Sequence, residues 1–232
     1  MNQTLKNPGP LLMPRHLGRL LIVAAFLSIS LSAVSSSPRE QVLDDYKNGL
    51  APGWETKSFA GHTQYTAEHD DKQFYIKATS SAAASGLVYK IAYEPRDQPI
   101  LRWNWKIERT LVKGDERTKA GDDYAARIYV VFPSFLFWNT KALNYIWANK
   151  LPKGEALPNA FTANAVMIAV ESGNGRAGQW QSVERNIYKD FKKYFNTEPP
   201  RVGAIAIMTD TDNTGESTTA WYGPIIIGRD TP

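Results

Sequence analysis

The sequence predicts a mainly β protein: a single-domain antiparallel β-sandwich of jelly-roll or galactose-binding-like type, with two inserted helices. Three observations lead to this prediction. Short runs rich in β-branched and aromatic residues follow one another through most of the chain, turn-forming residues separate them, and only two stretches show helical periodicity. Many short strands with few helices are typical of β-sandwiches. The alternative is an α+β fold in which both helices pack on one sheet.

The N-terminal part of the chain has the pattern of an export signal. Arg15 and Arg19 precede an apolar run from Leu20 to Val34, and the small residues that close the run fit a cleavage site. The run is short for a bilayer span, which needs about 20 residues, and no cysteine follows it that could carry a lipid. We therefore expect a signal peptide over residues 1–35, one β-sandwich domain over residues 36–232, and a periplasmic or secreted location without a membrane span after cleavage. A retained anchor is the alternative.

Composition excludes several classes of function. The chain has 27 basic and 23 acidic residues, and losing Lys6, Arg15 and Arg19 with the leader leaves 24 basic residues. The remaining domain then lacks the excess of positive charge that a nucleic-acid partner requires. The absence of cysteine excludes disulfides, thiol catalysis and cysteine-ligated zinc, and only His62 and His69 follow the leader. A histidine metal site or a Ser-His-Asp triad is therefore not expected, and no cofactor is predicted.

The strand predictions rest on residue type and on alternation. In the segment 99–108, Leu101, Trp103, Trp105 and Ile107 fall on one face, and polar residues fall on the other. The predicted strands cover residues 55–59, 63–68, 73–80, 86–93, 99–108, 124–132, 162–172, 201–210 and 219–228.

Two stretches are predicted to be helical. In residues 139–150, apolar side chains recur at spacings that share a helix face, Asn139 is suited to an N-cap, and Pro152 prevents extension. In residues 182–196, an apolar stripe lies opposite a group of lysines, and Ser182 is suited to the N-cap.

The segment GDDYAARIYVVF (121–132) places two acids before a strand that carries Arg127. Asp123 and Arg127 lie roughly 13 Å apart along an extended strand, so Arg127 needs a partner from another segment. A second acidic cluster, MTDTDNTGES, follows a predicted strand and can supply it. The combination fits either a structural brace or a ligand site. The candidate ligand-binding residues here are Asp122, Asp123, Arg127, Asp210, Asp212 and Asn213.

Three chemical alternatives compete for these acids. The run DTDNTG begins like an EF-hand loop but has Thr214 at position 5 and Trp221 at position 12, which excludes an EF-hand and leaves a looser Ca²⁺ site open. A pair of aspartates could also serve a polysaccharide hydrolase or lyase. A serine hydrolase is not indicated, because no G-x-S-x-G motif is present.

The chain has seven tryptophans and eleven tyrosines, which can pack in the core or stack against a ligand. Trp103 and Trp105 fall on the apolar face of their strand and are assigned to the core. Trp221, close to the acidic turn, and Trp147 are the candidates for stacking against a ligand. The apolar region 133–147 offers a surface for a partner protein.

Four motifs carry a family resemblance: WNWKIE, GDDYAARIYVVFP, ALNYIWAN and RVGAIAIMTDTDNTG…AWYG. Over residues 40–228 the sequence resembles a family of bacterial exported proteins catalogued as a domain of unknown function (3047). The resemblance implies a single β-rich domain in a bacterial envelope setting. It implies no catalytic residue and no established activity.

These observations favour an exported, non-catalytic domain that binds a glycan or another polar envelope ligand. The alternatives are a polysaccharide hydrolase or lyase that uses the paired aspartates, and a structural subunit of an envelope assembly.

Overall fold

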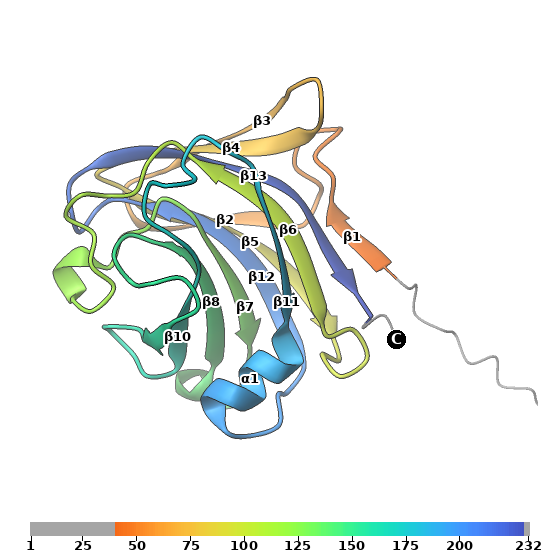
Figure 1. Cartoon of the computed structure of the whole chain (residues 1–232). Helices are drawn as coiled ribbons and strands as arrows, with labels where there is room; N and C mark the ends of the chain where they lie inside the picture. The colour runs from red at the N-terminus through yellow and green to blue at the C-terminus, as the bar shows by residue number, and fades with distance from the viewer. Residues whose placement is uncertain (1–39, 230–232) are drawn as a thin grey trace, which may run out of the picture. The chain divides into compact units, whose positions relative to one another are not determined.

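The computed structural model describes residues 40–229, which form two β-sheets packed face to face (Figure 1). The predicted signal peptide lies outside the described residues. The six-stranded sheet has the order β11-β6-β13-β4-β3, with β1 also paired to β13. Its strands are β1 (Glu40–Asp44), β3 (Gln64–His69), β4 (Phe74–Ser81), β6 (Ile100–Ile107), β11 (Gln181–Asn186) and β13 (Ser217–Gly228).

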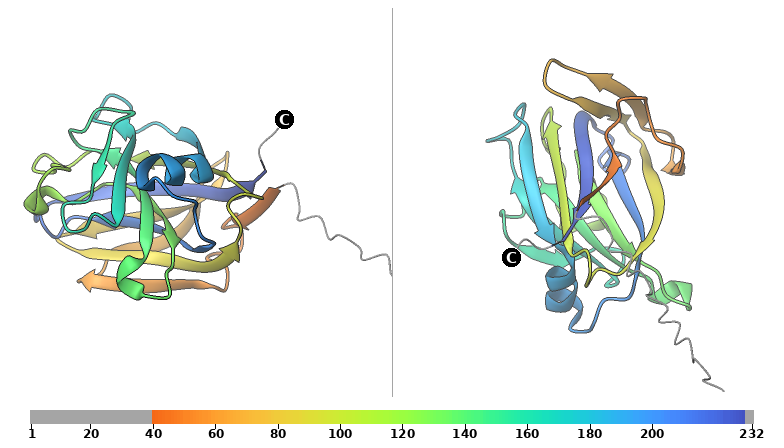
Figure 2. Two further views of the ribbon diagram at one scale, coloured as in Figure 1. Left: turned by 90° about the horizontal axis from the view of Figure 1, so that it is seen from below. Right: turned by 90° about the vertical axis from the view of Figure 1, so that its right-hand side faces the viewer.

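The seven-stranded sheet has the order β2-β5-β12-β7-β8-β10-β9 (Figures 1 and 2). The pairing of β8 with β10 is parallel, whereas the other strand pairs in the described part of the chain are antiparallel. The predicted sandwich is therefore confirmed, with one parallel pair that the sequence did not indicate. The strands are β2 (Trp54–Ala60), β5 (Ala84–Tyr93), β7 (Arg127–Phe132), β8 (Lys141–Ala148), β9 (Ala156–Pro158), β10 (Ala165–Ser172) and β12 (Val202–Asp210).

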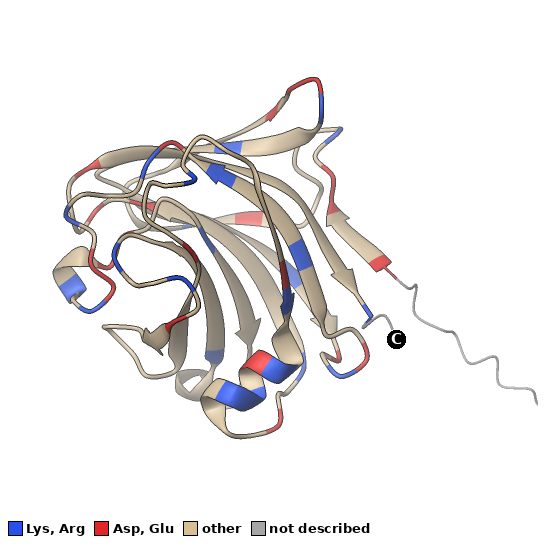
Figure 3. Ribbon diagram, viewed as in Figure 1, with Lys and Arg blue, Asp and Glu red and all other residues tan. Residues whose placement is uncertain are grey.

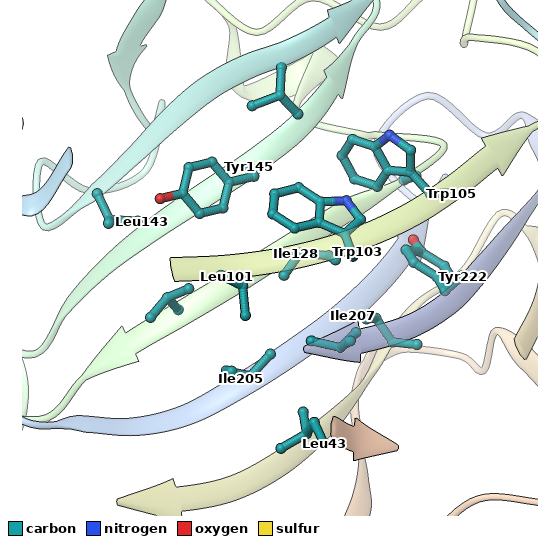
Figure 4. Close-up of a cluster of buried hydrophobic side chains, with 14 of the residues drawn as sticks. Leu43, Leu101, Trp103, Trp105, Ile128, Leu143, Tyr145, Ile205, Ile207 and Tyr222 are labelled. Atoms are coloured by element: carbon teal, nitrogen blue, oxygen red, sulfur yellow. The ribbon is translucent and has the colours of Figure 1, made fainter. Parts of the chain in front are cut away.

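The core lies between the two sheets and is rich in aromatic side chains (Figure 4). The alternating residues of β6 are buried as the sequence predicts, with Trp103 and Trp105 on the core face. Trp103 meets Tyr145 of the opposite sheet at a ring-centroid distance of 5.4 Å, and Trp105 meets Trp147 at 6.0 Å. These contacts join the two sheets through large buried surfaces, which dominate the stability of such a core.

The helix predicted over residues 139–150 is wrong, because this segment forms β8. Leu143, Tyr145 and Trp147 point into the core, while Asn144 and Ile146 lie on the outer face and are also buried. A strand with apolar residues on both faces has no clean two-residue period, so the helical spacing of its side chains misled the prediction. The tertiary pairing with β7 and β10 determines the outcome.

The second predicted helix is correct only in its C-terminal part. Residues up to Asn186 form β11, where Ser182 pairs with Asn104, and the helix α1 covers Ile187–Phe195. The N-cap is Asn186 rather than Ser182, since the Asn186 side chain accepts a hydrogen bond from the backbone N–H of Lys189 at 2.9 Å. Ile187 and Phe191 of α1 insert into one end of the core.

Two short 3-10 helices, η1 (Lys119–Gly121) and η2 (Phe137–Asn139), complete the helical structure of the described part. The strands β1, β9 and β11 were not predicted. Within residues 40–229, no helix combines the length and the apolar character that crossing a bilayer requires.

Candidate functional site

The two acidic corners of the chain meet in space. Asp123 of the first corner accepts hydrogen bonds from the second: its Oδ2 from the backbone N–H of Thr214 at 2.6 Å, and its Oδ1 from the Asn213 side-chain amide at 3.2 Å and backbone N–H at 3.3 Å. In the reverse direction, Asp210 Oδ1 accepts from the backbone N–H of Tyr124 at 3.2 Å. The turn after β12 and the approach to β7 are therefore held together by carboxylates.

Arg127 forms a buried ion pair with Asp210 on the neighbouring strand β12. The two residues are 5% and 1% exposed. The guanidinium carbon also lies 5.0 Å from the ring centroid of Tyr124 and 5.3 Å from that of Tyr129, at distances suited to cation–π attraction. The sequence predicts that Arg127 needs a partner from another segment, and Asp210 supplies it. The ion pair braces β7 against β12.

The acids of this cluster influence one another strongly. Asp123, Asp210 and Asp212 each offer one carboxylate oxygen, and these three oxygens all lie within 4.8 Å of one another. Burial, together with the charges of Asp123 and Asp122, raises the pKa of Asp210 to about 8, although Arg127 acts in the opposite direction. Burial and the neighbouring Asp123 likewise raise the pKa of Asp212. The cluster therefore takes up a proton at a higher pH than an isolated aspartate.

The three acids have the number of carboxylates that a calcium ion could use, but their surroundings fit it poorly. Asp123 already accepts from the N–H groups of the second corner, and Asp210 accepts from Tyr124 and Arg127. The guanidinium also places a positive charge inside the cluster. A calcium site normally directs six to eight free oxygens at the ion, whereas Asp123 and Asp210 are already engaged in the brace.

A groove of about 800 Å³ lies on the outer face of the seven-stranded sheet. Its floor combines small residues, Gly86 on β5 and Ala204 and Ala206 on β12, with larger ones such as Tyr129 and Met208. The acidic corners form one end. Phe59 on β2 and Phe161 in the loop before β10 stand on the two sides. Small side chains on the central strands leave the face hollow, and this is what makes the groove.

Two buried polar atoms among the described residues have no hydrogen-bond partner at this groove: Nε of Arg127 and Oδ1 of Asn144. Asn144 pairs with Tyr129 across β7 and β8. Arg127 lies two residues before Tyr129 and so shares its face, which makes Arg127 and Asn144 diagonal neighbours on the outer surface of the sheet. Buried polar atoms without partners are rare in proteins and require an explanation.

The predicted residues are distributed unevenly. Asp122, Arg127, Asp210, Asp212 and Asn213 line the groove, and Asp123 lies behind them in the brace. Asp122 accepts hydrogen bonds from the Tyr124 hydroxyl at 2.9 Å and from the Asn159 side chain at 2.9 and 3.1 Å, and so ties the loop beside the groove to the first corner.

The two predicted stacking tryptophans lie away from the groove. Trp147 is fully buried in the core, where its indole N–H donates to the carbonyl of Gly173 at 3.0 Å. Trp221 lies on the six-stranded sheet, half-buried, with the Lys106 ammonium 4.3 Å from its ring centroid. Neither residue lines the groove, because proximity to the acidic turn in sequence says nothing about the sheet on which a side chain lies.

Sequence reasoning missed several groove residues. Asn144 offered a signal, since it is the one amide in the middle of an otherwise apolar run. Phe59, Phe161 and the small residues of the floor gave none, because they come from separate strands and become neighbours only in the folded sheet.

The fold and the groove define the class: a β-sandwich domain with an open, ligand-sized groove on one sheet. The chain belongs to a family described as protein of unknown function (DUF3047), whose model matches residues 52–226. No curated protein matches the chain significantly.

The solved structures that resemble this domain include β-sandwich carbohydrate-binding modules. The family 11 module from Clostridium thermocellum, in complex with a β-1,3-1,4-mixed-linked tetrasaccharide, is 11% identical with a TM-score of 0.45, and the match covers 81% of this chain and 94% of that chain. The family 30 module of a cellulosomal cellulase of the same organism is 10% identical with a TM-score of 0.44, and the match covers 78% and 93%. Similarity at this level concerns the fold alone.

Proposed function

We propose that this protein is a binding domain that holds a polar, hydroxyl-bearing ligand, a segment of a glycan, in the groove of the seven-stranded sheet. The observation that carries the proposal is the pair of buried atoms without partners, Nε of Arg127 and Oδ1 of Asn144. The guanidinium nitrogen can only donate, and the amide oxygen can only accept. A hydroxyl group does both, so the hydroxyls of a sugar ring are complementary to this pair.

The rest of the groove supports the same ligand class. The carboxylates of Asp122 and Asp212 at the polar end can accept hydrogen bonds from further hydroxyls. The floor, with Gly86, Ala204 and Ala206, lets the C–H face of a ring approach the backbone closely.

The arrangement favours binding over cleavage. Glycosidases hold two carboxylates on opposite sides of the scissile bond, roughly 5–10 Å apart. Here one oxygen each of Asp123, Asp210 and Asp212 lies within 4.8 Å of the others at one end of the groove, and Asp123 and Asp210 are engaged in the brace. They do not face each other across the floor.

A groove-filling substitution tests the proposal. Ala206→Phe places a ring on the floor of the groove, and Ala67→Phe places the same ring at an exposed position of β3 on the other sheet. Binding of a panel of bacterial and plant polysaccharides is measured by affinity electrophoresis, and hits are measured by calorimetry. We expect the wild type and Ala67→Phe to bind the same glycan and Ala206→Phe to lose it. Equal binding by both variants, or no glycan bound by the wild type, overturns the proposal.

The polar end is tested separately with Asn144→Leu, which keeps the volume and removes the acceptor. Loss of one hydrogen bond to a ligand hydroxyl costs about 1–2 kcal/mol, so the affinity should fall about tenfold.

An extracytoplasmic setting is part of the proposal. It rests on the leader pattern of residues 1–35 and the single domain predicted over residues 36–232. N-terminal sequencing of the protein recovered from a cell-envelope fraction tests it: a mature chain that begins near residue 36 is expected, and full-length protein in the cytoplasm would contradict it.

A further inference from the structure

Four consecutive large apolar side chains are exposed in the loop between β7 and β8. Phe135 is 103% exposed, Leu136 40%, Phe137 78% and Trp138 58%. They account for four of the nine exposed large hydrophobic residues in the described part of the chain. Isolated exposed apolar residues are ordinary, but a contiguous group marks an interaction surface. We call residues 135–138 the aromatic tip.

Hydrogen bonds hold the backbone of the aromatic tip in place. The backbone N–H of Asn139 donates to the carbonyl of Leu136 at 2.8 Å, and that of Thr140 donates to the carbonyl of Phe137 at 3.1 Å. The Asn164 side chain donates to the carbonyl of Trp138 at 2.6 Å. These hydrogen bonds fix the backbone of the tip as a turn and join it to the neighbouring loop, while its rings remain exposed.

The charge around the aromatic tip is positive. No acidic residue occurs between Asp123 and Glu155, and Lys141 stands at the base of the tip. The tip and the end of α1 border the same depression, lined among others by Phe135, Lys141 and Phe191, so both lie at the lower end of the sandwich in Figure 1.

The helix α1 adds Lys193 to this charge (Figure 3), while its Lys192 pairs with Glu198, which lines the same depression. Its single acid, Asp190, is buried and pairs with Arg185. Glu198, which follows the helix, is engaged by Lys192 and by other basic and hydroxyl groups.

We infer that the aromatic tip docks on the surface of a phospholipid bilayer that contains anionic lipid. Trp and Phe side chains favour the interfacial region of a bilayer, and lysines near the surface are attracted to anionic headgroups. At about 200 Å² per ring, the three rings together with Leu136 expose on the order of 500 Å², less than the roughly 800 Å² that each partner of a stable protein complex buries. A narrow apolar tip with a basic surround fits a lipid surface better than a protein face. This inference is independent of the proposed glycan binding.

The chain contains no cysteine, so a single introduced thiol can carry an environment-sensitive fluorophore. Phe137→Cys reports on the tip. Val112→Cys is the matched control, because Val112 is 79% exposed and its backbone N–H donates to Glu216, just before β13, at the opposite end of the sandwich. The full chain is mixed with vesicles of phosphatidylcholine alone and with vesicles that also contain phosphatidylglycerol.

We expect the label at position 137 to shift to shorter wavelength and to be quenched by lipid-linked nitroxide, more strongly with phosphatidylglycerol and less at high salt. The label at position 112 should not respond, even if the apolar run of residues 20–34 tethers the chain. Equal responses at both positions overturn the inference, as does a silent label at 137 or a shift that depends on protein concentration without vesicles.

A label-free variant provides the second test. Phe135→Ser/Phe137→Ser changes only exposed side chains, so the fold is retained. Lipid-linked nitroxide quenches the fluorescence of Trp138 when the tip enters the bilayer, and the signal of the other tryptophans is subtracted with Trp138→Phe proteins. The double variant should require at least about tenfold more lipid than the parent chain for the same quenching. An unchanged lipid requirement overturns the inference.

Discussion

Asp123→Ala tests whether the two corners are held as described. The substitution removes the acceptor for the backbone N–H of Thr214, which is buried, and for the two N–H donors of Asn213, which is exposed. A hydrogen bond to a charged group contributes about 1.5–3 kcal/mol. The Asn213 donors can turn to water and should cost only about 1 kcal/mol together. Relief of the repulsion between Asp123 and the neighbouring acids offsets part of this loss.

The net destabilisation should therefore be about 2–4 kcal/mol. For a domain of this size, 1 kcal/mol corresponds to about 2–4 °C in Tm, so we expect Tm to fall by about 4–16 °C. Thermal and urea unfolding, followed by circular dichroism, measure the effect. Asp123→Asn keeps one acceptor and should lose about half as much. Asp71→Ala, in the exposed turn between β3 and β4, is the matched control and should not change Tm. A Tm for Asp123→Ala within about 2 °C of the control would refute the idea that this carboxylate joins the corners.

Three further predictions follow from the site. Because folding raises the pKa of Asp210 from 3.8 to about 8, the folded state keeps a proton that the unfolded chain releases, so this contribution is largest below pH 4 and is lost as the pH rises to about 8. In urea unfolding between pH 5 and 8, the stability of Asp210→Asn should accordingly improve relative to wild type as the pH rises; a constant difference would contradict the assigned pKa. Addition of calcium or of a chelator should leave Tm unchanged, and a calcium-dependent rise would restore the calcium alternative. Trp147→Ala should lower the free energy of unfolding by about 3–5 kcal/mol, whereas Trp221→Ala should cost about 1 kcal/mol or less and leave glycan affinity unchanged in calorimetry.

The sequence was informative where one physical constraint acted alone. Alternation along β6 identified the core positions Trp103 and Trp105, because only one face of that strand is apolar. The reach of an extended strand required a distant partner for Arg127, and Asp210 is that partner. These inferences needed only the geometry of a single segment.

The failures occurred where neighbouring strands decide the outcome. β8 is covered on both faces, so its apolar residues fit a helical spacing as well as an alternating one. The groove depends on Gly86, Ala206 and other small residues of several strands, whose side chains share a surface only after the sheet has formed. Trp147 was assigned to a ligand because its strand was mistaken for a helix. Pairing between distant segments, which a local pattern does not contain, accounts for each of these errors.

The order of the strands has a consequence for how the protein is produced. β12 lies between β5 and β7, and β13 lies between β6 and the strands β4 and β1, so the last two strands of the described part occupy central positions in both layers. A nascent chain that lacks them cannot close either layer. Both layers can therefore form only after β12 and β13 have been synthesised. A premature stop codon before residue 202 would yield an unfolded product rather than a shortened domain.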